Sequence, residues 1–146
     1  MRSVLFTGRR NAARSVMAET CFNAAMIPGW RAFSGGWQPQ MEIDPLALKV
    51  LAANGFPVDS LSSKPVEIFT QAGAPAVDLC VFLDVHLPDD AGNYPGEHLH
   101  WSVPDPSNGE ASRVSYEAAL TLITARISTL ILSGRLLGKG AFALAS

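Results

Sequence analysis

Residues 4–19 read VLFTGRRNAARSVMAE, and this stretch decides the fold of the chain. The apolar run Val4–Phe6 is typical of a buried strand, and it stops at the polar loop GRRNAARS, residues 8–15. A strand, a tight polar loop and a helix together favour anion binding, because the loop amides and the first helical N–H groups point into one concavity. The helix is indicated by residues at spacings of three and four, namely Val16, Met17, Thr20, Cys21 and Ala24.

Three arginines strengthen this expectation. Arg9 and Arg10 lie in the loop, and Arg14 stands at the expected start of the helix. A guanidinium group there can bind two oxygens of a tetrahedral anion, and the helix dipole adds partial positive charge. We therefore expect an anion site made by eight consecutive residues: Gly8, Arg9, Arg10, Asn11, Ala12, Ala13, Arg14 and Ser15.

Strand-like and helix-like runs alternate along the rest of the chain. Asp44 and Pro45 suit the start of a helix, and Gly55 suits its end. This alternation predicts an α/β fold with a parallel sheet and right-handed crossovers. The expected strands are 4–6, 30–33, 77–83 and 98–101, and the expected helices are 16–24, 45–54, a short one near 65–69, and 112–132.

Composition narrows the class of protein. A length of 146 residues suits one domain over 1–146, with 48% hydrophobic and 16% charged residues as in ordinary globular proteins. A net charge of −2 gives no general attraction to nucleic acid or anionic membranes. The first apolar run is too short for a signal peptide, and Arg126 and Arg135 interrupt the apolar C-terminal stretch before it could span a membrane. We expect a cytoplasmic protein.

The cysteines and histidines predict no metal site and no cofactor. The two cysteines, Cys21 and Cys80, have neither a CxxC nor a metal-type spacing, and we expect buried, reduced thiols. His98 and His100 would share one strand face near an acidic loop, but the spacing fits no standard ligand pattern. That loop contains Asp84, His86, Asp89 and Asp90.

The sequence around the loop resembles a known family. Low-molecular-weight protein tyrosine phosphatases and thioredoxin-coupled arsenate reductases have a strand, then C-x-G-N-x-x-R-S, then a helix that opens x-M-A-E. The resemblance implies a flavodoxin-like three-layer sandwich with a four-stranded parallel sheet, of the phosphotyrosine protein phosphatase I type. It continues through Phe33–Gly36, Pro45–Ala47, Ser63–Pro65 and His100–Pro106, which contains the motif Pro-Asp-Pro.

Two positions depart from the family pattern. Gly8 stands where the family has its nucleophilic cysteine, and Arg10 stands where it has a loop glycine. In the family the thiolate attacks phosphorus or arsenic, and the aspartate of Pro-Asp-Pro, here Asp105, protonates the leaving oxygen. The loop 84–95 also contains no cysteine, which arsenate reductases need. We therefore expect no thiol-based catalysis.

Three functions are left open. The first is a non-catalytic domain that binds phosphate, sulfate or a phosphorylated ligand at Gly8–Ser15. The second is a phosphoric-ester hydrolase in which Asp105 activates water beside a phosphate held by Arg14. The third is a scaffold or homodimer with a vestigial site. A tail from about residue 133 extends past the family's usual end, and it would dock on the domain or on a second subunit.

Overall fold

A computed structural model of the chain describes residues 1–137, and its centre is a parallel sheet. The strands are β1 (Arg2–Thr7), β2 (Trp30–Gly35), β3 (Leu79–Phe82) and β4 (Glu97–His100), in the order β2-β1-β3-β4. The first strand is therefore central and pairs on both sides. Thr7, its last residue, lies opposite Gly35 of β2 and Phe82 of β3, so these three strands end together. This edge receives the loops that follow each strand.

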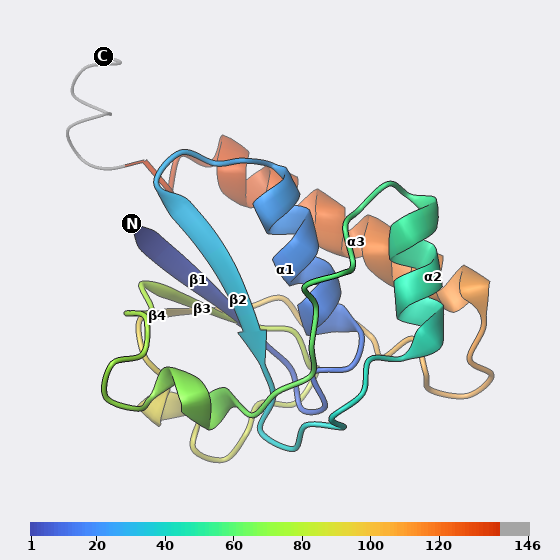
Figure 1. The fold of residues 1–146 in the computed structure, drawn as a ribbon, viewed down its shortest axis with the longest axis horizontal. Coiled ribbons are helices and arrows are strands. Elements are labelled where there is room, and N and C mark those ends of the chain that lie inside the picture. The colour runs from blue at the N-terminus through green and yellow to red at the C-terminus, as the bar shows by residue number, and fades with distance from the viewer. Residues whose placement is uncertain (138–146) are drawn as a thin grey trace.

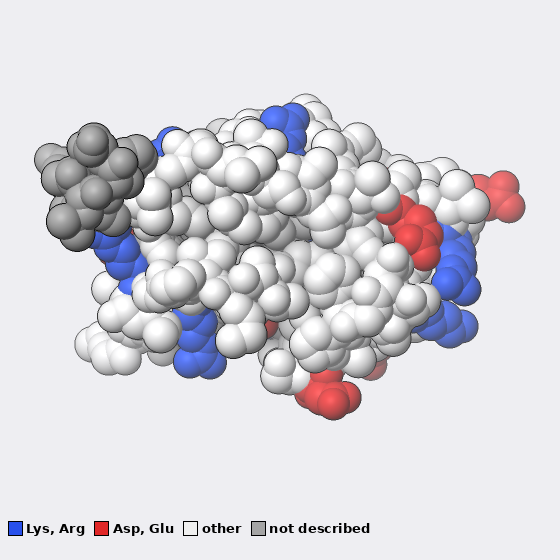
Figure 2. Space-filling model, turned by 90° about the horizontal axis from the view of Figure 1, so that it is seen from above, with Lys and Arg blue, Asp and Glu red and all other residues white. Residues whose placement is uncertain are grey.

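Three α-helices cover one face of the sheet (Figure 1): α1 (Arg14–Ala24), α2 (Pro45–Ala53) and α3 (Arg113–Leu132). The larger core lies between them and the sheet, because alternate residues of β1, Val4 and Phe6, point to this side. Phe6 packs on Phe22 of α1 and on Trp101. The helical face carries few charges, and most of those lie toward its margins (Figure 2).

The opposite face has a thinner cover. Leu5 and Cys80 point to this side and pack with Phe82 against a short 3-10 helix, η1 (Val66–Phe69). A second 3-10 turn, η2 (Ala91–Asn93), lies in the loop between β3 and β4. The two layers that cover the sheet are therefore unequal, with three α-helices on one side and short turns on the other.

The expected elements are present with shifted ends. The third strand covers 79–82 instead of 77–83, whereas the first extends to Arg2–Thr7. The last helix begins with a capping box in which Ser112 and Ser115 bond reciprocally. Asp44 precedes α2 as expected, but its carboxylate makes no capping bond and instead accepts from the Tyr116 hydroxyl at 2.8 Å.

The C-terminal part of the chain is described as far as residue 137. Leu136 is buried, and its carbonyl accepts a hydrogen bond of 2.8 Å from the indole of Trp30. The start of the expected extension, from about residue 133, therefore docks on the domain, and residues 138–146 lie outside the described residues. On the last helix Leu120, Ile123, Ile127 and Leu130 are buried as expected, but Ile131 is exposed because it lies beyond the buried stripe.

Candidate functional site

The loop of residues 8–15 lies where the central strand ends. Gly8 follows β1 directly, and Arg14 is the first residue of α1. Asn11 has a left-handed φ of 47° and is buried. Its side chain holds this conformation in place, because it donates to Ser15 Oγ at 2.7 Å and accepts from the Lys64 amide at 2.8 Å. Asparagine tolerates left-handed backbone better than most residues, so the loop can turn here without glycine.

The segment after β2 orients the loop by donating hydrogen bonds to its carbonyl groups. Gln38, Gln40 and Asp44 donate backbone hydrogen bonds of 2.8–2.9 Å to the carbonyls of Arg9, Arg10 and Ala12. Gly36 permits this approach, since a Cβ there would lie 2.7 Å from the Arg9 carbonyl oxygen and 2.8 Å from that of Gly8. These bonds pair the loop carbonyls with the segment after β2, and residues 10–13 line a small space inside the loop. Among the described residues, the amides of Arg10, Asn11, Ala12 and Ala13 donate no hydrogen bond.

Arg14 extends its guanidinium group across this concavity. Its side chain is 10% exposed, and Nη1 donates to the Val103 carbonyl at 2.7 Å. Nη2 lies 2.9 Å from Asp84 Oδ1 and 3.7 Å from Asp105 Oδ2. The loop thus presents a nearly buried cation beside a row of amide donors, which is a suitable environment for an oxyanion.

The Asp84 carboxylate already lies in this environment. It follows β3, and Oδ2 accepts from the Arg9 amide at 3.3 Å. Oδ1 lies 2.9 Å from the point that a Cβ on Gly8 would occupy, so the missing side chain at residue 8 makes room for it. Oδ1 is buried and in ion-pair distance of Arg14, but no donor reaches it with hydrogen-bond geometry. A buried oxygen without a hydrogen bond costs about 1–3 kcal/mol.

Arg10 and Asp105 form a second ion pair at the entrance. Arg10 Nη2 lies 3.2 Å from Asp105 Oδ2, and Nη1 donates to Gln40 at 3.0 Å. Burial favours a raised pKa for Asp105, but hydrogen bonds from Ser107 and the charges of Arg14 and Arg10 outweigh it and hold the pKa below its usual value. Asp105 is therefore ionised at neutral pH and acts as an acceptor. The role of Asp105 as a general acid stays a prediction.

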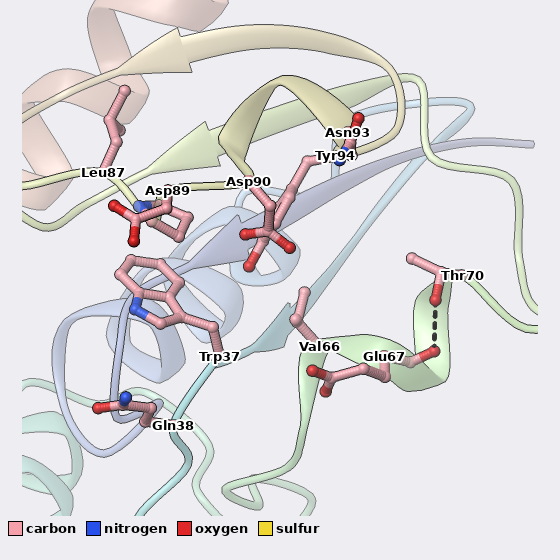
Figure 3. A pocket seen from close by; sticks show the side chains of 11 residues that line it. Trp37, Gln38, Val66, Glu67, Thr70, Leu87, Asp89, Asp90, Asn93 and Tyr94 are labelled. Carbon is pink, nitrogen blue, oxygen red and sulfur yellow. Dashed lines mark hydrogen bonds between the residues drawn. The ribbon is translucent and has the colours of Figure 1, made fainter.

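Two neighbouring cavities open at this edge of the sheet. The arginine cavity, of about 320 Å³, is lined by the three loop arginines together with Asp84 and Asp105. The carboxylate cavity, of about 670 Å³, is lined by Glu67, Asp89 and Asp90 and by Tyr94. Trp37 and Leu87 line both cavities. Figure 3 shows the Trp37 indole projecting into the carboxylate cavity toward Asp89.

A third, much smaller space lies inside the loop itself. It is bounded by loop residues and by Asp84, and its volume is about 10 Å³. This volume is at the lower limit for one water molecule. Arg10, Arg14 and Asp84 line both this space and the arginine cavity, so their side chains lie at the boundary between the two.

The two thiols lie away from both large cavities. Cys21 is in α1 and Cys80 is in β3, both buried, and burial raises the pKa of each thiol to about 12. Neither residue lines the arginine cavity. In the described part of the chain, no group of three or more His, Cys, Asp or Glu could hold a metal ion.

The structure brings most of the expected site residues together. Gly8, Arg10, Asn11, Ala12, Ala13, Arg14 and Ser15 line the small space, and Arg9 and Asp105 join Arg10 and Arg14 in the arginine cavity. Sequence reasoning missed the contact of Asp84 with the loop. The only signal was a general one: a residue that follows one central strand lies near the residue that follows its neighbour, but this does not identify the partner of its side chain.

The strand order, the loop after the central strand and the covering helices define a flavodoxin-like α/β protein with a polar loop between its central strand and its first helix. The sequence model of the low molecular weight phosphotyrosine protein phosphatases matches residues 3–139, and the chain belongs to this family. A search of curated proteins finds no match. No described helix is long and apolar enough to cross a membrane, and a cytoplasmic location stays a prediction.

Three solved structures illustrate the similarity. An arsenate reductase from Archaeoglobus fulgidus is 28% identical, with 88% of this chain and 98% of that chain covered and a TM-score of 0.68. An arsenate reductase in the phosphate binding state is 24% identical, with 91% and 98% covered and a TM-score of 0.72. A low molecular weight phosphotyrosine phosphatase from Vibrio cholerae is 20% identical, with 94% and 99% covered and a TM-score of 0.73.

Proposed function

We propose that this protein is a non-catalytic member of its family that binds phosphate, sulfate or a phosphorylated ligand at the Gly8–Ser15 loop. The observation that carries the proposal is the row of loop amides, residues 10–13, that donate no hydrogen bond among the described residues and lie beside the Arg14 guanidinium. Buried amides normally have partners, and a tetrahedral oxyanion would supply them. The phosphate-binding state of the arsenate reductase with the same fold agrees with this proposal.

The absence of turnover is the second part of the proposal. Residue 8 is glycine and has no group that could attack phosphorus. The two buried thiols have pKa values raised to about 12, so they supply almost no thiolate at neutral pH. Asp105 is ionised and paired with Arg10, which favours neither proton donation nor activation of water. These features favour binding over hydrolysis.

The carboxylate cavity is where we place the organic part of a phosphorylated ligand. It adjoins the arginine cavity through Trp37 and Leu87, and Trp37 and Tyr94 offer aromatic surface. Its three carboxylates disfavour a second anionic group. The ligand class is therefore a compound with one phosphoryl or sulfuryl group and an uncharged or cationic remainder.

Calorimetric titration with inorganic phosphate tests the binding. We expect millimolar affinity, with thermal stabilisation that follows RT ln(1 + [L]/Kd), or about 2.7 kcal/mol at 100-fold excess over Kd. Arg14→Lys keeps the charge but loses the planar guanidinium, and we expect at least about tenfold weaker binding. Arg113→Lys, at an exposed position on α3, is the matched control and leaves the affinity unchanged. Equal affinity of Arg14→Lys and the parent would refute the site.

A phosphate-ester assay tests the absence of turnover. We expect no hydrolysis above background for the parent, because the loop has no nucleophile at residue 8. Hydrolysis that persists in a Cys21→Ser, Cys80→Ser double variant would instead favour the water-based mechanism with Asp105.

A further inference from the structure

The position of Asp84 bears on how the loop binds an anion. Its carboxylate borders the space of about 10 Å³ inside the loop and contacts both the Arg9 amide and the Arg14 guanidinium. These are the two kinds of donor that an external oxyanion would use. A phosphate ion is several times larger than the remaining space, so it cannot reach the amides of residues 10–13 while Asp84 stays in place.

We propose that Asp84 is the residue that sets the anion affinity and selectivity of this loop, as an internal carboxylate that an external oxyanion must displace. This inference rests on the proposed function. Gly8 makes the arrangement specific to this chain, because a Cβ at residue 8 would lie only 2.9 Å from Asp84 Oδ1. Any larger residue at this position would force the end of the Asp84 side chain to shift.

The contacts of Asp84 indicate that it can be displaced. Oδ1 is buried and lies 2.9 Å from Arg14 Nη2, but this contact lacks hydrogen-bond geometry, and the contact from the Arg9 amide to Oδ2 is long, at 3.3 Å. The planar carboxylate leaves four neighbouring loop amides without a partner. A tetrahedral oxyanion has more acceptor oxygens and can reach donors that the carboxylate does not. A planar monocarboxylate such as acetate offers nothing that Asp84 lacks, so the loop selects against carboxylate ligands.

Two substitutions remove the carboxylate by independent routes. Asp84→Asn removes one negative charge beside the anion and frees the Arg14 guanidinium. We expect phosphate to bind about tenfold more tightly, which corresponds to about 1.4 kcal/mol. Gly8→Ala adds no charge and places a methyl group against the flexible end of Asp84. We expect it to tighten phosphate binding about threefold or more.

The test is calorimetric titration of the full chain with inorganic phosphate, and with acetate at matched ionic strength. Asp59→Asn, at an exposed position after α2, is the control for the loss of one charge and leaves the affinity unchanged. Acetate binds neither the parent nor Asp59→Asn.

The outcomes separate the inference from the function on which it rests. If the parent binds phosphate and both single variants stay within twofold of it, Asp84 does not compete and the inference is refuted, while the proposed function stands. If no form binds phosphate, both fail. If Asp84→Asn does not fold, Gly8→Ala tests the inference alone. An unchanged phosphate affinity of Gly8→Ala would then refute the competition between Asp84 and phosphate.

Discussion

The arginine cavity and the carboxylate cavity share a wall, Trp37 and Leu87, yet their charges are arranged differently. In the arginine cavity, Arg10 is paired with Asp105 and Arg14 with Asp84. In the carboxylate cavity, none of the three acidic side chains forms an ion pair with another described residue. A cation could therefore enter the carboxylate cavity without displacing anything. In the arginine cavity Arg9 likewise forms no ion pair with another described residue, but an anion that binds Arg10 or Arg14 must replace an internal partner. The pairing of the charges, as well as their number, therefore has to be considered for each cavity.

Among the substitutions that test this comparison, Gly36→Ala should have the largest effect, on both stability and phosphate binding. The new Cβ would meet the carbonyl oxygens of Arg9 and Gly8 at 2.7 and 2.8 Å, and these are backbone atoms that cannot move cheaply. We expect a loss of about 2–3 kcal/mol in the free energy of unfolding, measured by urea denaturation, and weaker phosphate binding. Gly92→Ala, beside the carboxylate cavity, meets no atom within 4 Å and is the matched control, with little expected change.

Gly8→Cys should show the effect of a negative charge inside the loop. Both Cys and Ala at residue 8 displace the Asp84 carboxylate, but only the thiol can ionise. We expect phosphate to bind several-fold more weakly to Gly8→Cys than to Gly8→Ala, with a difference that grows as pH rises through the pKa of the thiol. Titrations at several pH values measure this. A constant difference across pH would instead indicate a purely steric effect.

Asp105→Asn should have a smaller effect, on stability, with a defined pH dependence. The pKa of Asp105 is lowered from 3.8 in the folded state, so its ionised form stabilises the fold above that pH. The contribution is lost as pH falls through the folded-state pKa. We therefore expect the parent to melt slightly above Asp105→Asn at pH 7, and the gap to close in acid. A gap that widens in acid would contradict the assigned ion pair with Arg10.

Asp90→Asn should have the smallest effect. Asp90 lines the carboxylate cavity and not the arginine cavity, so it acts on a bound phosphate only through long-range electrostatic repulsion. We expect less than a twofold gain in phosphate affinity at low salt and none at high salt, where the Debye length is a few ångströms. A salt-independent gain would show that the two cavities are coupled more closely than the shared Trp37 and Leu87 suggest.

The sequence alone was enough to predict the order of elements and most of the loop. Short-range signals carry that information, namely the strand–loop–helix pattern of residues 4–24 and the glycines and prolines between elements. The ends of β3 were less predictable. Asp78 interrupts the apolar stretch, and the strand begins directly after it, at Leu79. The Asp78 carboxylate accepts a hydrogen bond of 2.9 Å from the Ser3 amide, which is a tertiary contact.

Contacts between distant segments were the part that the sequence could not supply. Asp84 and Arg10 both carry charges of ordinary kinds, and nothing in the local pattern indicates that one meets Arg14 and the other meets Asp105. The partner of each side chain depends on how loops from distant parts of the chain are arranged at the end of the sheet. The exposure of Ile131 also depends on tertiary packing. The apolar pattern of the last helix includes Ile131, but the face of the helix that packs on the domain does not.

The central position of β1 also determines the order in which the loop can be completed during folding. The parallel pairing of β1 with β3 joins Thr7 to Phe82, and Asp84 is only two residues further along. The step that seats β3 beside β1 therefore brings the carboxylate to Gly8 at the same time. This step joins segments about 75 residues apart in the chain, so it depends on a slow, long-range contact. We therefore expect the contact between Asp84 and the loop to form together with this pairing, so that a newly folded protein meets its first anion with Asp84 already in place.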